Sequence, residues 1–282
     1  MVADTRCVCG ENPLWHPMTR KVYWTDIPRG HLYSYDPATG EHQRIYEGDV
    51  VGGFTIQQDG SLLLFMARGT VKLWRGGFFI PVIEEIPAER ESRFNDVIAD
   101  PVGRVFCGTM PTEAGPGRLY LLDVDGTLRL VLKGVETSNG LGFSPDRKSL
   151  YYTDSGKREI YRFTYHLGSG AISHRQLFVR VPEGEGVPDG MTVDAEGYVW
   201  SARWDGGCLV RYTPEGEEER RIEFPARKVS SVTFGGDDYK DMYVTTAGGE
   251  DRETEGPGAG ALFRLRLGIR GVPEFPSRIG FL

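Results

Sequence analysis

The stretch PDGMTVDAEGYVWSAR, residues 188–203, joins a short apolar segment, a turn and a strand-like run of β-branched and aromatic residues. The same order recurs along the chain, and six such runs can be aligned. Their starts are 40 to 49 residues apart, a period typical of propeller blades. The six runs are VYWTD from Val22, LLLFM from Leu62, VFCGT from Val105, LYYTD from Leu150, VWSAR from Val199 and MYVTT from Met242.

Each repeat contains further strand signals. A second run follows every first one: LYSYD from Leu32, VKLWR from Val71, LYLLD from Leu119, IYRFT from Ile160, LVRYT from Leu209 and LFRLR from Leu262. A short apolar stretch ending in a turn precedes every first run, and a fourth strand is expected at residues 41–47, 128–132, 174–179 and 218–224. Sheets of this size bury their faces by stacking around an axis.

We therefore predict an all-β protein, a six-bladed β-propeller with about four antiparallel strands per blade, forming a single domain over residues 1–282. A large β-sandwich or two smaller β domains is the alternative, but neither accounts for six near-equal repeats. Residues 5–9 are expected to supply a closing strand to a blade that the sequence does not identify. Residues 249–258 are expected to form a charged surface loop, which could cap the mouth.

The composition excludes several classes of partner. Asp and Glu number 40 against 33 Lys and Arg, so the net charge of -7 lacks the basic footprint of nucleic-acid binding. The longest apolar run, residues 62–67, is too short to span a bilayer, and residues 1–10 carry no apolar signal core. The four cysteines, at positions 7, 9, 107 and 208, form no CxxC pair and are expected to be reduced thiols. We expect a soluble cytoplasmic protein without a membrane partner.

The repeat register predicts a ring of side chains. The innermost strand of each blade lines the channel, so equivalent positions meet at one mouth. Four of the six side chains there are carboxylates or amides, and two carboxylates repel across a channel unless a cation lies between them. Oxygen donors suit calcium or magnesium, and manganese or zinc could also bind. The six residues are Glu11, Phe54, Asn95, Asn139, Asp189 and Ser231.

A structural alternative exists for three of these positions. The pairs Asn139–Gly140 and Asp189–Gly190 are typical of hairpin turns, and Asn95–Asp96 is a common capping pair. Turn chemistry does not require each pair to fall at the same end of the same strand, so the shared register with Glu11 favours a site.

At these same positions the chain resembles the regucalcin (senescence marker protein), gluconolactonase and sugar-lactone lactonase family of six-bladed propellers. The resemblance covers nearly the whole sequence and rests on five ordered motifs. They are GENPLW at residues 10–15, RFNDVIADPVGRVFCGTM at 93–110, SNGLGFSPD at 138–146, PDGMTVDAEGYVW at 188–200, and FGG followed by MYVTTA at 234–247.

The resemblance implies a single divalent metal ion held by Glu11, Asn139 and Asp189. Calcium is the first expectation, with zinc, manganese, magnesium or iron as alternatives. It also implies that Arg93 and Asn95 face the substrate, and Glu113 corresponds to a third substrate-binding residue. In the first motif, Asn12 stands where the family has a small residue, and the loop at residues 111–118 is short beside some relatives.

The function that the resemblance implies is hydrolysis of sugar lactones of the gluconolactone or xylonolactone type to aldonic acids. One metal ion with open positions can polarise a carbonyl, activate water and stabilise the oxyanion. Our hypothesis is that the lactone carbonyl binds the metal while Asp189, both ligand and catalytic base, accepts a proton from the attacking water. Arg93 and Asn95 would orient the substrate, and Trp204 is a candidate pocket wall that stacks on a sugar ring.

Two other functions remain open at this point. One is a phosphotriesterase-like metal-dependent hydrolase, and the other is a non-catalytic calcium-binding or interaction propeller. The sequence holds no GxSxG, P-loop or HExxH motif, so serine hydrolase, nucleotide-binding and zincin functions have little support. Because a closed propeller leaves no free sheet edge, a monomer or weak homo-oligomer is expected.

Overall fold

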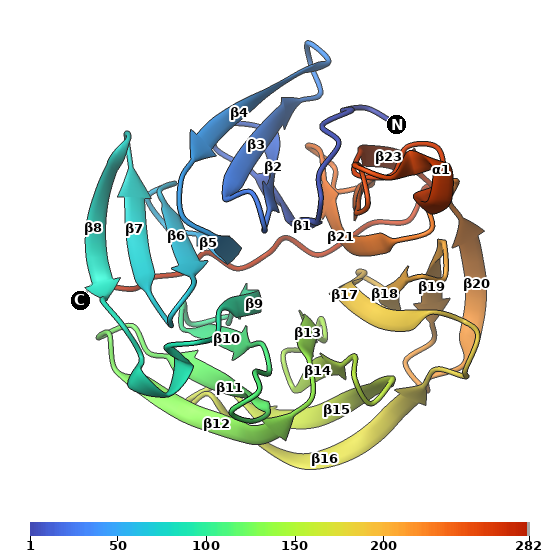
Figure 1. The fold of residues 1–282 in the computed structure, drawn as a ribbon. Coiled ribbons are helices and arrows are strands. Elements are labelled where there is room, and N and C mark those ends of the chain that lie inside the picture. The colour runs from blue at the N-terminus through green and yellow to red at the C-terminus, as the bar shows by residue number, and fades with distance from the viewer. Residues whose placement is uncertain (281–282) are drawn as a thin grey trace.

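Six antiparallel sheets are arranged in a ring around a central axis in the computed structural model, which describes residues 1–280 (Figure 1). This arrangement confirms the predicted six-bladed β-propeller. Five sheets contain four strands each and the sixth contains three. The blades follow one another in chain order, and within each blade the strands run outward from the axis.

The strand bounds are as follows. The first three blades are β1 (Gly10–His16), β2 (Lys21–Asp26), β3 (His31–Asp36), β4 (Glu41–Glu47); β5 (Val51–Ile56), β6 (Leu62–Met66), β7 (Val71–Arg75), β8 (Phe78–Ile83); and β9 (Phe94–Ala99), β10 (Val105–Thr109), β11 (Gly117–Leu122), β12 (Leu128–Val135). The last three are β13 (Ser138–Phe143), β14 (Ser149–Asp154), β15 (Glu159–His166), β16 (Ala171–Arg180); β17 (Val187–Val193), β18 (Val199–Trp204), β19 (Cys208–Tyr212), β20 (Glu218–Glu223); and β21 (Val229–Gly235), β22 (Asp241–Thr246), β23 (Leu262–Arg266).

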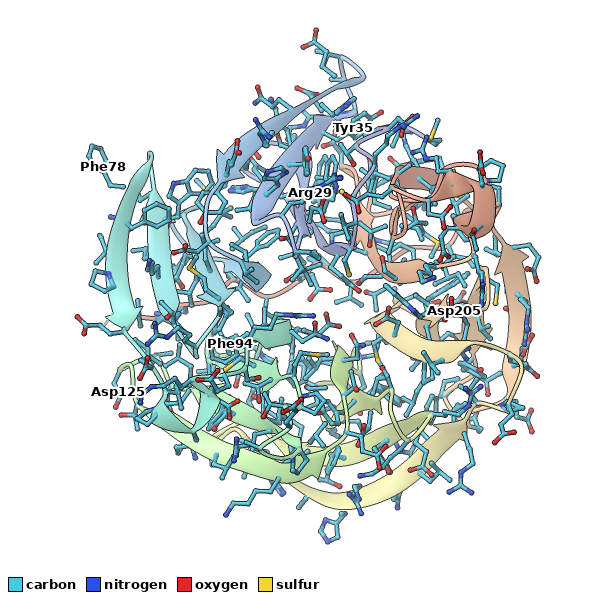
Figure 2. The ribbon with its side chains drawn as sticks, viewed as in Figure 1. Arg29, Tyr35, Phe78, Phe94, Asp125 and Asp205 are labelled. Atoms are coloured by element: carbon cyan, nitrogen blue, oxygen red, sulfur yellow. The ribbon has the colours of Figure 1, made fainter. Side chains whose placement is uncertain are left out.

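The sequence of each strand matches its distance from the axis. All five residues of β6, LLLFM, are buried because both faces of a middle strand pack against neighbouring blades. The outer strand β20, EERRIE, is mostly exposed. Apolar side chains fill the spaces between blades, where Phe106 of the third blade packs with Tyr152 of the fourth. Figure 2 shows Phe94 close to the axis and Phe78 at the outer edge.

The N-terminal segment completes the sixth blade. Ala3 pairs antiparallel with Leu262 of β23, and Cys9 pairs with Ala247 just after β22. The expected closing segment at residues 5–9 is confirmed in part, because Cys9 and Cys7 pair with the sixth blade, but the pairing also includes Ala3, outside those bounds. Arg6 has a φ of 50°, which interrupts an extended strand between the two paired positions.

The sequence analysis did not predict two outer elements, the strand β8 and a helical turn. The fourth strand of the second blade, β8, contains Pro81, which an edge strand tolerates because one side of its backbone makes no ladder. Residues 249–258 contain a single helical turn, α1 (Arg252–Glu255), and the side chain of Arg252 pairs with Asp4. This segment is therefore tied to the N-terminal segment that closes the ring.

Residues 270–280 form a C-terminal strap that crosses one end of the channel. Its first part pairs with the fifth blade, where Gly271 forms a bridge with Asp194. Its last part pairs with the second blade, where Ser277 forms a bridge with Gln57, and the Arg278 amide donates to the Gly103 carbonyl of the third. Figure 1 shows the strap running across the ring toward β8. Within residues 1–280, no helix has the length and apolar character needed to cross a bilayer.

Candidate metal and substrate site

Four inner strands bring polar side chains to one cavity. Glu11 of β1, Asn95 of β9, Asn139 of β13 and Asp189 of β17 all line a cavity of about 470 Å³ at the mouth opposite the strap, together with Arg93. Five of the six site residues that the sequence singled out therefore lie together, although they are spread over 178 positions from Glu11 to Asp189.

A β-bulge accompanies each of the three side chains expected to bind metal. The strand register shifts directly after Glu11 in β1, after Asn139 in β13 and after Pro188 in β17. A bulge bends a strand and re-aims the side chain beside it, which explains how residues inside a regular blade turn toward the mouth. In β1 the bend falls at Asn12, whose φ of 50° lies in the left-handed region that asparagine tolerates.

The glycines after Asn139 and Asp189 serve close packing, not turns. Both pairs lie inside strands, so the hairpin-turn alternative does not hold. A Cβ on Gly140 would lie 2.5 Å from the carbonyl oxygen of Asp189. A Cβ on Gly190 would lie 2.2 Å from Oγ of Ser231. Glycine at both positions lets adjacent inner strands approach within contact distance around the axis.

Hydrogen bonds hold the amides of the site. Nη1 of Arg93 donates to Oδ1 of Asn95 at 2.7 Å, and Nδ2 of Asn95 donates to the Ser138 carbonyl at 2.8 Å and to Oδ1 of Asn139 at 3.3 Å. Nδ2 of Asn139 donates to Oγ of Ser155 at 2.9 Å. The backbone amide of Asn12 donates to Oε2 of Glu11 at 3.1 Å. The amides are thus oriented by a chain of contacts.

The carboxylates destabilise one another in their charged forms. Glu11 and Asp189 are each 4% exposed. Burial raises the pKa of Glu11 well above its usual range, and the charges of Asp189 and Asp96 raise it further. Burial also raises the pKa of Asp189, with Asp96 as the next contribution. A cation between them would relieve this repulsion, so the donor set of two carboxylates and one amide fits a hard divalent ion.

Further side chains line the same mouth. Trp204 is among them, as the sequence suggested, and so are Met110, Ser155 and Arg158, which the sequence did not single out. Met110 and Ser155 each come directly after the second strand of a blade, so counting that position would have found both. The guanidinium of Arg158 donates to the carbonyls of Val181, Pro182 and Gly186 and fixes the loop before β17.

Glu113 lies apart from this group. It is exposed in a tight turn closed by the Thr112 amide donating to the Gly115 carbonyl at 2.9 Å, and it does not line the cavity. Met110, at the start of the same loop, does line it. The structure therefore places Glu113 outside the mouth, and its role in substrate binding stays a prediction.

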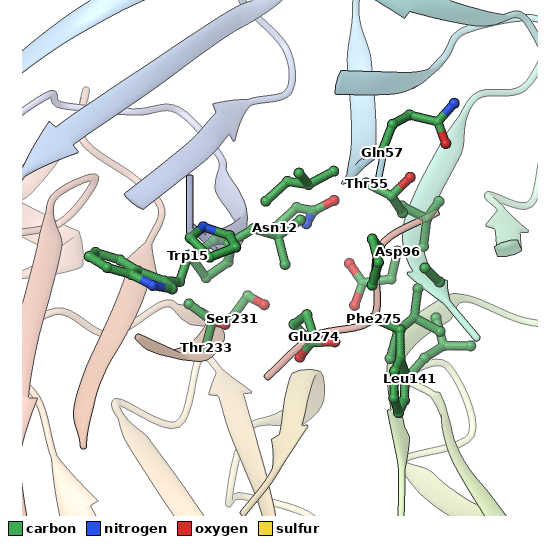
Figure 3. Close-up of a pocket in the computed structure, with 18 of the residues that line it drawn as sticks. Asn12, Trp15, Thr55, Gln57, Asp96, Leu141, Ser231, Thr233, Glu274 and Phe275 are labelled. Carbon is green, nitrogen blue, oxygen red and sulfur yellow. The ribbon is translucent and has the colours of Figure 1, made fainter. Parts of the chain in front are cut away.

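A second cavity lies on the axis beneath the C-terminal strap. It measures about 210 Å³ and is lined by Asp96, Ser231 and, from the strap, Glu274 and Phe275 (Figure 3). Of the six ring positions, Ser231 therefore faces this cavity, while Phe54 packs in the apolar core of the second blade. Burial raises the pKa of Asp96 and of Glu274 to about 7 in each case. The ring of polar residues thus separates two compartments of the channel.

The fold and the site define a family. A model of the SMP-30/Gluconolactonase/LRE-like region matches residues 9–248, which include all four inner strands that carry the polar side chains. The chain belongs to the SMP-30/gluconolactonase/LRE-like family. The resemblance predicted from the five motifs is confirmed.

Individual members of the family are similar to this chain over nearly its whole length. The chain is 50% identical over 285 residues to pentonolactonase XacC of Haloferax volcanii, covering 99% of this chain and 97% of the relative. It is 34% identical over 288 residues to regucalcin of Bos taurus, covering 98% and 96%. Among solved structures, a luciferin-regenerating enzyme superposes with a TM-score of 0.89 at 26% identity, covering 97% of this chain and 96% of the other.

Proposed function

We propose that this protein is a metal-dependent sugar lactonase that hydrolyses lactones of the gluconolactone or xylonolactone type to aldonic acids. The observation that carries the proposal is the convergence of Glu11, Asn139 and Asp189 on one cavity that Arg93 and Asn95 also line. The whole-length similarity to a protein named pentonolactonase supports the same class of substrate.

Glu11, Asn139 and Asp189 would hold the metal ion. Their donors are oxygens. Burial raises the pKa of both carboxylates, and nearby negative charges raise them further, those of Asp189 and Asp96 for Glu11 and that of Asp96 for Asp189. When bound, a divalent cation would act as a Lewis acid on the lactone carbonyl. Calcium is our first choice because oxygen-only donors suit it, and zinc, manganese, magnesium and iron are the alternatives.

The side chains would divide the remaining work. A carboxylate oxygen of Asp189 accepts a proton from the water that adds to the carbonyl carbon, and the proton then passes to the ring oxygen as the ring C–O bond breaks. Arg93 uses Nη1 to hold Asn95 and Phe94. Its other nitrogens make no hydrogen bond within residues 1–280, so they can donate to substrate oxygens. Trp204 would contact the sugar from the cavity wall. Glu113, which lies outside the cavity, would contribute to substrate binding only if the loop at residues 111–118 approached the bound sugar.

A substrate panel tests this proposal. Chelator-treated protein is assayed by acid release on gluconolactone, xylonolactone and a phosphotriester, before and after addition of single divalent metals. Glu11→Gln protein is the matched control, because spontaneous lactone hydrolysis is the same in both samples. We expect metal-dependent acid release from a lactone by the wild type alone. Release only from the phosphotriester, or no metal dependence, would overturn the proposal.

A further inference from the structure

The Ser155 hydroxyl lies between two inner strands of the site. Its residue follows β14 directly and is 7% exposed. Oγ of Ser155 donates to the Pro188 carbonyl at 2.6 Å and accepts from Nδ2 of Asn139 at 2.9 Å. One hydroxyl therefore links the amide of Asn139 on β13 to the residue that precedes Asp189 on β17.

The hydrogen bonds that join Asn139, Ser155 and Pro188 allow only one orientation of the Asn139 amide. A carbonyl can only accept, so the single hydrogen of the Ser155 hydroxyl is directed to Pro188. The hydroxyl then offers only lone pairs to Asn139. The amide of Asn139 must therefore present Nδ2 to Ser155, and Oδ1 is turned away from it.

At the other end of this series of hydrogen bonds, Arg93 requires the same direction of donation. A guanidinium can only donate, so Arg93 fixes Oδ1 of Asn95 toward itself at 2.7 Å. Nδ2 of Asn95 then faces Oδ1 of Asn139 at 3.3 Å. The hydrogen bonds from Arg93 through Asn95, Asn139 and Ser155 thus all run in one direction and end at the Pro188 carbonyl, which accepts. Among these groups, the proposed metal site uses Asn139.

We infer that Ser155 is a positioning residue for the metal site, because it sets the Asn139 amide with its oxygen available to the cation. The inference rests on the proposed function, since it assumes that Asn139 is a ligand. A flipped amide would point NH₂ hydrogens at the cation and remove a donor. Contacts that orient a ligand are typically worth about 10- to 100-fold in metal affinity.

The test measures calcium affinity by titration calorimetry on chelator-treated protein, independently of turnover. Ser155→Ala should weaken calcium binding by about 10- to 100-fold. The matched control is Ser277→Ala, a buried hydroxyl in the strap that likewise accepts from a side chain, Thr55, and donates to a carbonyl, Ile56. It should bind calcium as the wild type does.

A double-variant cycle isolates the orienting role. A carboxylate has two equivalent oxygens and needs no orientation, so Ser155→Ala should have less than about a threefold effect on affinity in an Asn139→Asp background. Equal loss in both backgrounds, or no loss with Asn139 present, would overturn the inference. Should Ser155→Ala fail to fold by circular dichroism, the near-isosteric Ser155→Cys carries the same comparison with the same expected losses.

Failure of the inference is distinguishable from failure of the proposed site. If wild-type protein binds no calcium or other divalent ion, or if Glu11→Gln leaves the affinity unchanged, the metal site itself is wrong. If Glu11→Gln abolishes binding while Ser155→Ala leaves it intact, the site stands and the role of Ser155 is wrong.

Discussion

Asp189 is the one residue of the site to which we assign two roles. Its carboxylate is buried within the bulge of β17, next to the negative charges of Glu11 and Asp96. A buried carboxylate beside like charges is costly for stability, and such residues concentrate at functional sites. In the proposed reaction this one group is both ligand and proton acceptor.

Asp189→Asn should therefore lose turnover more than it loses metal. The amide keeps one oxygen donor but cannot accept a proton, so kcat should fall by about 10²- to 10⁴-fold at saturating metal. Steady-state kinetics on a lactone checks this, with the exposed turn residue Asp125→Asn as the matched control. Undiminished kcat in Asp189→Asn would show that another group takes the proton.

At the residue scale, the sequence predicted those site residues that the repeats and family motifs mark. The repeats placed Glu11, Asn139 and Asp189 at one mouth because each lies near the start of an inner strand, at its second or third residue. It did not distinguish Ser231, which faces the other cavity, since a bulge of one residue decides the direction of a side chain. Ser155 was not recognised, because a serine after a strand carries no signal of its hydrogen-bond partners.

Neighbouring inner strands approach closely near the axis at positions where glycine provides no side chain. Gly52 of β5 lies so close to β9 that a Cβ there would be 1.9 Å from the Phe94 carbonyl oxygen. The inner strands are the part of each blade where neighbours come nearest. A methyl group at that point would push the second and third blades apart.

Gly52→Ala should therefore lower the free energy of unfolding by about 3 kcal/mol, the upper part of the range for overpacking. Gly168→Ala is the control, because a Cβ on Gly168, in the turn after β15, meets no atom within 4 Å. Denaturant unfolding of both variants measures the difference. Equal stability of Gly52→Ala and Gly168→Ala would contradict the close approach of β5 and β9.

At the element scale, the sequence predicted strands whose pattern repeats and missed those that depart from it. The second and third strands of every blade, which contain the aligned runs, share β-branched and aromatic residues, and the structure has them all. β8 was missed because Pro81 breaks the usual strand composition. Pairing of Ala3 with Leu262 depends on ring closure between distant parts of the chain, which local sequence does not encode.

The C-terminal strap joins opposite sides of the whole molecule. Its Glu274 faces the axial cavity together with Asp96 (Figure 3). Burial raises the pKa of Glu274 to about 7, partly offset by a hydrogen bond from Thr192. The folded protein therefore holds this proton more tightly than the unfolded chain does. The strap should make stability depend on pH.

The sign follows from linkage. Unfolding releases the Glu274 proton between the unfolded pKa of 4.5 and about 7, so the free energy of unfolding falls as pH rises through this window. Glu274→Gln mimics the protonated form and should be more stable than the wild type by about 3 kcal/mol near pH 8, with little difference near pH 4.5. Denaturant unfolding at both pH values measures it, and a constant difference would contradict the shift. Asp96, whose pKa is also raised to about 7, is present in both the wild type and Glu274→Gln, so its titration contributes to the stability of both.

At the scale of the whole molecule, six repeats sufficed to predict the ring, because stacking is the solution open to sheets that cannot bury both faces alone. The strap was not predicted, since residues 270–280 belong to no repeat and their pairing partners lie in the second, third, fifth and sixth blades. The axial cavity was equally out of reach, because residues of the strap form part of its lining.

The central claim is that Glu11, Asn139 and Asp189 close around one divalent cation at the open mouth. Anomalous diffraction from crystals soaked in manganese tests it most directly, because the scattering locates the ion without reference to activity. We predict one peak bounded by Oδ1 of Asn139 and the carboxylates of Glu11 and Asp189, absent in Glu11→Gln crystals. A saturated crystal whose peaks all lie elsewhere would contradict the account.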